Sequence, residues 1–179
     1  MKTYKDWAKR EFTLRQRLAA FIPEGAFFLI VLPVSLILLS NAIDRWLLIP
    51  RFPGGGWNIA AAILCFIGGG FLGFWAIYTQ VTAGRGTPVP MMPTQKLVAQ
   101  GPYAYSRNPM TLGTMLAYWG IGFLIGSFSA LALVLTAGGA LLLYCKFIEE
   151  KELAARFGPD YLEYKRSTPF LIPRLTRRK

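Results

Sequence analysis

The sequence contains no histidine, so it lacks the side chain that most often serves as a general base at neutral pH. It has only two cysteines, Cys65 and Cys145, and both fall within or at the end of long apolar stretches. They are expected to pack as small hydrophobic side chains, and no disulfide framework is expected. Acidic residues are also scarce, because nine of them stand against 20 lysines and arginines. No metal site is expected.

Long apolar blocks dominate the chain, in which 54% of the residues are hydrophobic and 16% are charged. A hydrocarbon core about 30 Å thick requires about 20 apolar residues in a spanning helix. Four stretches reach or approach this length, at about residues 26–46, 57–81, 110–126 and 129–148. The sequence therefore predicts an all-α integral membrane protein, with four transmembrane helices in a single domain over residues 1–179.

The basic residues are distributed unevenly between the two sides of these predicted spans. Eighteen of them lie before the first span, between residues 82 and 109, or after residue 145. Only Arg45 and Arg51 fall on the other side. Because basic loops tend to stay in the cytoplasm, this distribution places both termini and the second loop there. It also explains the net charge of +11 by contact with membrane lipid, without nucleic acid as a partner.

Three further features of the membrane region follow from residue spacing. Apolar residues recur at helical spacing among basic ones before the first span, which predicts an interfacial amphipathic helix over residues 1–22. The same region has no continuous apolar core, so a cleavable signal peptide is not expected. Glycines at positions 68, 69, 70 and 73 mark the second span as a packing helix. Only about residues 126–129 join the last two spans, which predicts a helical hairpin with both open ends in the cytoplasm.

Arg107, Asn108 and Pro109 stand directly before the third span. Proline is favoured at the first helical position and asparagine is a good capping residue, so the helix is expected to begin here with Asn108 as its cap. Free backbone N–H groups beside a guanidinium would form a receptor for a carboxylate or phosphate. A capped helix with an interfacial arginine and no ligand would account for the same residues.

Glu149 and Glu150 directly follow the fourth apolar stretch, which is a costly position for two acids unless each has a partner. Adjacent helical residues point to different faces. One carboxylate is therefore expected to pair with Lys146 or Arg107, and the other to accept hydrogen bonds from a ligand hydroxyl or ammonium group. The alternative is that both acids only mark the place where the helix leaves the membrane.

Several motifs on the cytoplasmic side occur together and in order. The chain contains Gly101-Pro102-Tyr103, then Arg107-Asn108-Pro109 with Gly113 one turn later, then Glu149-Glu150 followed by Phe157-Gly158, Tyr161 and Tyr164. In this combination the sequence resembles the isoprenylcysteine carboxyl methyltransferase and phospholipid methyltransferase family of integral membrane enzymes. The resemblance covers residues 84–173, which are expected to form the cofactor-binding catalytic region.

This resemblance implies transfer of a methyl group from S-adenosylmethionine to a lipid-like substrate, with a carboxylate, amine or thiol acceptor, at the cytoplasmic membrane face. Arg107 and Glu150 would be catalytic. Matched by motif position, the cofactor-binding residues would be Val98, Gly101, Pro102, Tyr103, Arg107, Asn108, Pro109, Gly113, Glu149 and Glu150. Asn108 stands where the prenylcysteine enzymes have histidine, so their substrate does not carry over.

Two questions stay open at the level of sequence. A non-catalytic four-helix membrane scaffold, or a lipid-binding protein of the same fold, would carry the same spans and would not bind the cofactor. The tyrosines at positions 103, 105, 161 and 164 would either contact the ligand or serve as interfacial anchors.

Overall fold

The computed structural model describes residues 19, 22–53, 55–84 and 94–174. All regular secondary structure within these residues is helical, which confirms the predicted all-α fold. Three helical segments are long and apolar enough to cross a membrane: Ile22–Trp46, Gly56–Ala83 and Phe128–Ser167. The interfacial helix predicted over residues 1–22 lies outside the described residues, apart from residues 19 and 22.

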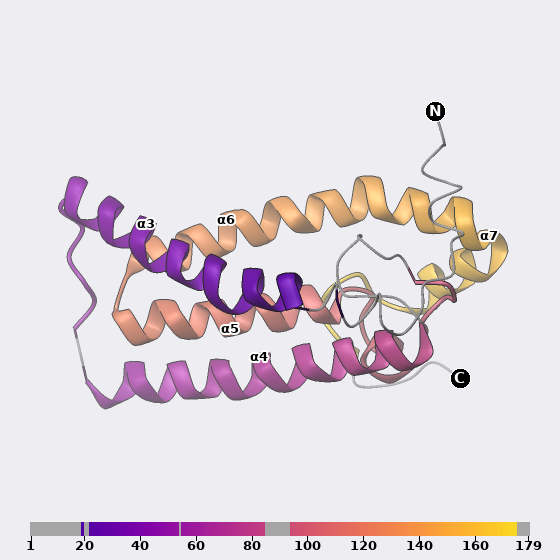
Figure 1. Ribbon diagram of the computed structural model, residues 1–179, viewed down its shortest axis with the longest axis horizontal. Helices are drawn as coiled ribbons and strands as arrows, with labels where there is room; N and C mark the ends of the chain where they lie inside the picture. Colours follow the sequence, from indigo (N-terminus) through magenta and orange to yellow (C-terminus); the bar gives the residue numbers. More distant parts are fainter. Residues whose placement is uncertain (1–18, 20–21, 54, 85–93, 175–179) are drawn as a thin grey trace.

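The helices form an elongated bundle. It contains α3 (Leu32–Trp46), which continues the π-helix η1 (Phe27–Val31), then α4 (Gly56–Ala83), α5 (Pro109–Ile125) and α6 (Phe128–Tyr144). Figure 1 shows the α3–α4 and α5–α6 connections at one end of the bundle, and the start of α5 at the other end together with α7. Only Gly126 and Ser127 separate α5 from α6, which confirms the predicted hairpin.

Helix α5 is shorter than the other apolar helices. Its 17 residues span about 26 Å at 1.5 Å per residue, slightly less than a hydrocarbon core of about 30 Å. It nevertheless packs most extensively against α4, the longest helix of the bundle. That α5 is the fourth membrane span remains a prediction.

The contact between α4 and α5 is a close approach of two backbones. A Cβ atom placed on Gly69 would lie 2.5 Å from the backbone nitrogen of Ala117, and one on Gly113 would lie 2.7 Å from that of Gly73. Small residues permit such contact where lipid provides no hydrophobic drive for helix association. Of the four clustered glycines, Gly69 and Gly73 therefore form the packing face predicted for this helix.

The opposite face of α4 presents large apolar side chains to the surroundings. Leu64, Ile67 and Phe74 are 71%, 65% and 72% exposed. Soluble monomeric proteins rarely carry a contiguous exposed apolar surface of this kind. Together with the three long apolar segments, this surface is that of an integral membrane protein.

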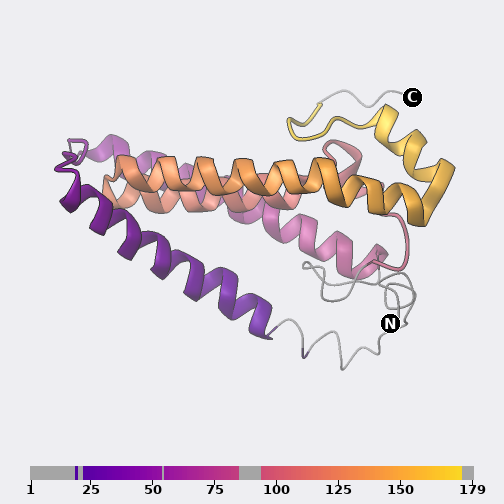
Figure 2. The same cartoon turned by 90° about the horizontal axis from the view of Figure 1, so that it is seen from above.

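Beyond α6, the chain continues through the π-helix η3 (Cys145–Glu149) into α7 (Glu150–Ser167). The helix changes direction at Gly158, whose φ of 55° and ψ of −129° lie in a region that favours glycine. Figure 2 shows the last part of α7 turning back over the end of the bundle. We call residues 159–167 the return half of α7, and residues 168–174, which follow it, the strap.

Candidate functional site

The Gly-Pro-Tyr motif forms a short 3₁₀ helix, η2 (Gly101–Ala104), that is fixed to the end of α4. A Cβ atom on Gly101 would lie 2.7 Å from Thr79 Oγ1, so the backbone lies directly on α4. Tyr103 Oη donates a hydrogen bond to Gln80 Oε1 at 3.0 Å. Burial raises the pKa of Tyr103, and the nearby charge of Glu149 raises it further. The Gly-Pro-Tyr motif is therefore held against the end of α4, and we call it the platform.

The return half of α7 is attached to this platform through its tyrosines. Tyr164 Oη donates to the backbone oxygen of Tyr103 at 2.8 Å. The ring of Tyr161 is 6.2 Å from that of Tyr164, centroid to centroid, and Tyr161 is only 1% exposed. Both tyrosines are thus internal residues of this region, in which the return half of α7 packs on the Gly-Pro-Tyr motif at the end of α4.

Helix α5 begins at Pro109, as the sequence predicts, but Asn108 does not cap it with its side chain. Asn108 Nδ2 instead donates to the backbone oxygen of Phe170 at 2.9 Å. The predicted capping hydrogen bond is therefore wrong. The reason is that the strap passes close to this amide and supplies an acceptor.

The strap is hydrogen-bonded to three consecutive residues before α5. Ser106 Oγ donates to the oxygen of Leu171 at 2.7 Å, and the backbone N–H of Arg107 donates to the oxygen of Pro169 at 2.9 Å. Phe170 is the residue between Pro169 and Leu171, and the centroid of its ring is 5.5 Å from Arg107 Cζ. These contacts fix both the backbone and the guanidinium of Arg107.

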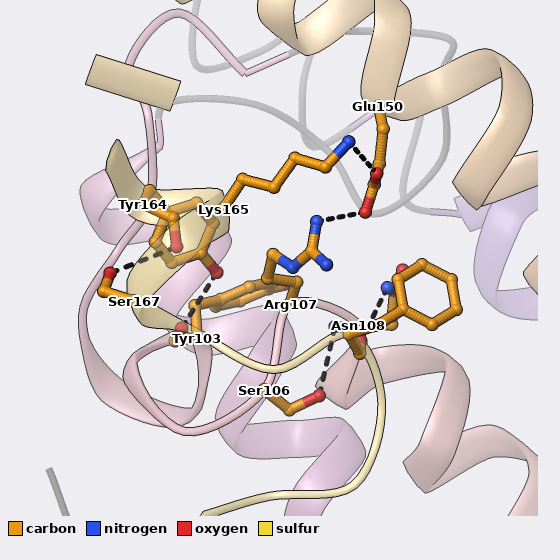
Figure 3. Close-up of polar contacts among 9 residues, drawn as sticks. Tyr103, Ser106, Arg107, Asn108, Glu150, Tyr164, Lys165 and Ser167 are labelled. Carbon is orange, nitrogen blue, oxygen red and sulfur yellow. Dashed lines mark hydrogen bonds and ion pairs between the residues drawn. The ribbon is translucent and has the colours of Figure 1, made fainter. Parts of the chain in front are cut away.

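Arg107 and Glu150 form an ion pair between Nη1 and Oε1, as Figure 3 shows. Their side chains are only 12% and 8% exposed. Lys165 approaches the same carboxylate, with Nζ 2.6 Å from Oε2, and is 44% exposed. Of the two cations proposed as partners for the acid pair, Arg107 is the one that binds. Lys146 instead has Nζ 5.9 Å from the Phe170 ring centroid.

A π-helical turn places Glu150 on the buried side of its helix. The backbone N–H of Glu150 donates to the oxygen of Cys145, five residues earlier, and both residues are buried. In a regular α-helix, side chains five positions apart would point about 140° away from each other. The longer hydrogen-bonded step of η3 brings both to the same face.

A small cavity of about 30 Å³ lies at the centre of these contacts. It is lined by Arg107, Asn108, Cys145, Glu149, Glu150, Leu153, Tyr161 and Tyr164. Arg107 Nε is buried beside the ion pair and has no hydrogen-bond partner among the residues that the structure describes. The cavity is large enough for a water molecule, and it offers an unused donor together with two carboxylates.

The structure brings only part of the predicted site to this cavity. Arg107, Asn108, Glu149 and Glu150 line it, whereas the other predicted residues do not: Val98, Gly101, Pro102, Tyr103, Pro109 and Gly113. Most of these residues instead pack against other parts of the protein. Val98 lies against Gly84, and Pro102 and Pro109 are fully buried.

Sequence reasoning missed Lys165 and the strap. The signal for Lys165 was its position one turn after Tyr161 on the same helix, which places both side chains on one face. The strap contacts involve backbone carbonyls, for which the sequence carries no signal.

Comparison with known proteins gives a match over the greater part of the chain. Residues 57–160 match a family model described as phospholipid methyltransferase. This range begins at the start of α4 and ends within the return half of α7. It includes every predicted site residue.

Three relatives were found among characterised proteins. The chain is 31% identical over 140 residues to methanethiol S-methyltransferase 2 of Bradyrhizobium diazoefficiens, with 78% of this chain and 51% of that protein covered. It is 29% identical over 175 residues to the nickel-cobalt-cadmium resistance protein NccN of Alcaligenes xylosoxydans xylosoxydans, with 92% and 75% covered. It is 32% identical over 80 residues to the cobalt-zinc-cadmium resistance protein CzcN of Cupriavidus metallidurans, with 45% and 37% covered. The chain thus spans about half the length of the methanethiol enzyme and less of CzcN.

Proposed function

Because this chain belongs to the phospholipid methyltransferase family, as its motifs predicted, we propose that it is an S-adenosylmethionine-dependent methyltransferase. The acceptor is a carboxylate, amine or thiol on a lipid-like or lipophilic molecule. When bound, S-adenosylmethionine supplies an electrophilic methyl group on a sulfonium sulfur. The observation that carries the proposal is the small cavity in which Arg107, Glu149 and Glu150 meet at the end of the bundle.

The groups that line this cavity fit the amino-acid part of the cofactor. That part carries a carboxylate and an ammonium group. Arg107 has a buried Nε–H that has no partner in the described part of the chain, and this group is a donor for the carboxylate. Glu150 is an acceptor for the ammonium group, which leaves Glu149 available for the proton of the methyl acceptor. The 30 Å³ cavity must widen to admit these groups, and the return half of α7 closes one side of it with Tyr161 and Tyr164.

The chain must also manage the proton of the acceptor. Since it has no histidine, the acceptor either arrives already ionised or gives its proton to a carboxylate. Glu149 lines the cavity and, within the described part of the chain, forms no ion pair with a lysine or arginine. We assign this role to Glu149. Arg107, held by Glu150 and the strap, positions the donor in line with the acceptor.

We further propose that the site faces the cytoplasm, with both termini on that side and four membrane spans. Arg45 and Arg51, the two basic residues separated from the others, lie near the α3–α4 connection, at the end opposite to α7 (Figure 1). The other basic residues that the structure describes belong to segments at the end that holds the cavity, as the positive-inside rule requires of a cytoplasmic face.

Cofactor binding by protein reconstituted in lipid nanodiscs tests the proposal. Calorimetry is expected to show binding of S-adenosylmethionine and S-adenosylhomocysteine with Kd values on the order of micromolar. Arg107→Met is expected to weaken binding at least tenfold, whereas Arg166→Met, which changes an exposed arginine on α7, leaves it unchanged.

Methyl transfer from labelled cofactor is then measured with three acceptors: a small thiol, a prenylated cysteine carboxylate and a phospholipid amine. Transfer to one class identifies the acceptor. Failure of the parent protein to bind either form of the cofactor would refute the enzyme proposal and favour the non-catalytic membrane scaffold.

A further inference from the structure

The strap that crosses the start of α5 is a stiff segment. It contains two prolines, Pro169 and Pro173, and each fixes its backbone φ at about −65°. The hydrogen bonds that attach the strap to residues 105–108 use only backbone groups of the strap. A different side chain at position 170 would therefore leave this attachment in place, and the Phe170 ring needs an explanation of its own. The strap also lies beyond residues 57–160, which match the family model.

The Phe170 ring contacts two cations. Its centroid is 5.5 Å from Arg107 Cζ and 5.9 Å from Lys146 Nζ. A cation over an aromatic face within about 6 Å of the centroid is attracted by the quadrupole of the ring. Arg107 is also held by its ion pair with Glu150, whereas Lys146 pairs with no acid among the residues that the structure describes. The ring is thus the partner that the structure gives to Lys146.

Lys146 stands at a spacing that normally leads to an ion pair. It precedes Glu149 by three positions and Glu150 by four on the same continuous helix, where opposite charges at this spacing attract each other. Glu150 already binds two cations, Arg107 and Lys165. Glu149 lines the small cavity and binds no lysine or arginine within the described part of the chain. Without the ring, Lys146 is therefore expected to pair with Glu149.

We propose that Phe170 is a positioning residue, which uses the face of its ring to keep Lys146 away from Glu149. The inference rests on the proposed function, in which the small cavity takes the amino-acid part of the cofactor. A lysine paired with Glu149 would place a second positive charge beside the ammonium group of the cofactor and repel it. It would also occupy the carboxylate to which we assign the proton of the methyl acceptor. Phe170 is not among the residues that line the cavity, so it acts through Lys146.

The test measures binding of S-adenosylhomocysteine, which has the same carboxylate and ammonium group as the methyl donor, by calorimetry in lipid nanodiscs. Phe170→Leu removes the ring face and keeps an apolar side chain. It is expected to weaken binding about fivefold to twentyfold, because each of the two cation–π contacts corresponds to about two- to fivefold. Phe170→Tyr keeps the ring face and should bind like the parent. Phe147→Leu makes the matching change at a phenylalanine that is 57% exposed, and this control should also bind like the parent.

The double variant Phe170→Leu/Lys146→Met separates positioning from a general loss of packing. If the ring acts by holding Lys146, removal of the lysine is expected to recover at least about twofold in affinity over Phe170→Leu. Lost packing of the strap would not be repaired by a change on another helix. Because the strap is attached through its backbone, Phe170→Leu is expected to fold, which thermal unfolding checks. Phe170→Met, which also lacks a ring, replaces it in both comparisons if it does not fold.

Three results would overturn this inference while binding by the parent leaves the proposed function intact. They are parental affinity in Phe170→Leu, a loss in Phe170→Tyr as large as that in Phe170→Leu, and no recovery in the double variant. Absence of any binding by the parent would overturn the proposed function and this inference together.

Discussion

Removal of either cation that binds Glu150 gives the sharpest test of the site. Arg107 and Glu150 are both nearly buried, at 12% and 8% exposure, whereas Lys165 is 44% exposed. Removing one partner of a buried ion pair typically costs about 3–5 kcal/mol, and without Arg107 the nearly buried Glu150 keeps only the partly exposed Lys165 as an ion-pair partner. An exposed ion pair contributes only about 0–1 kcal/mol. Arg107→Met is therefore expected to destabilise the protein far more than Lys165→Met.

The difference is measurable by thermal unfolding in detergent. In proteins of this length, 1 kcal/mol corresponds to a shift in Tm of roughly 2–4 °C. Arg107→Met is thus expected to lower Tm by about 6–20 °C, and Lys165→Met by no more than about 4 °C. The double variant Arg107→Met/Glu150→Leu removes both buried charges and should recover much of the loss.

Equal Tm shifts for Arg107→Met and Lys165→Met would refute this reasoning. They would mean that Arg107 is solvated in the membrane-bound protein and that its pairing with Glu150 contributes little.

The remaining predictions concern packing, ionisation and topology. Gly69→Ala is expected to destabilise the bundle by about 1–3 kcal/mol, because its Cβ would meet the backbone of Ala117, whereas Gly70→Ala, with open space around it, should cause no loss in the same unfolding assay. Because the pKa of Tyr103 is raised above the usual value of about 10, Tyr103→Phe should leave the tyrosinate absorbance unchanged up to about pH 11, and a reduced rise near pH 10 would contradict this. A reporter fused after Lys179 is expected to read as cytoplasmic, and an external reading would overturn the topology.

The sequence predicted the helices of the bundle well, because each depends on local properties. Apolar length predicted α4 and α6, and the proline at position 109 predicted where α5 begins. The side-chain role of Asn108 was not predictable in this way, since its partner, Phe170, is 62 residues away. The preference of asparagine for capping a helix is not realised here, because a carbonyl that is distant in sequence lies within hydrogen-bond distance of its side chain.

The site was predictable in part for the same reason. Arg107 and Glu150 are linked because the α5–α6 hairpin brings the two helix ends together, and the short turn at Gly126 predicted that. Lys165 reaches Glu150 only because the helix reverses at Gly158. The Gly-Pro pair at this position is a known signal for a break, and it was the available cue for this reversal.

Gly113 illustrates the opposite case, in which a motif position has a different neighbour from the one expected. It was matched to the cofactor site by its place after Pro109, yet it lies in the crossing of α5 with α4. The Gly-x-x-x-Gly spacing of Gly69 and Gly73 on the partner helix is the pattern that indicates such a crossing.

The π-helix η3 allows α6 and α7 to form one continuous helix although their functional faces point in different directions. The orientation of α6 is set by which of its sides meets lipid, whereas that of α7 is set by the need to aim Glu150 at Arg107. Each residue of an α-helix turns the chain by about 100°. The extra residue in η3 therefore rotates the faces of α7 about the helix axis relative to those of α6. Deleting one residue from Cys145–Glu149 would leave the membrane segment in place and swing everything beyond it by about 100°. Apart from Glu149, this short stretch should therefore tolerate substitution far better than any change in its length.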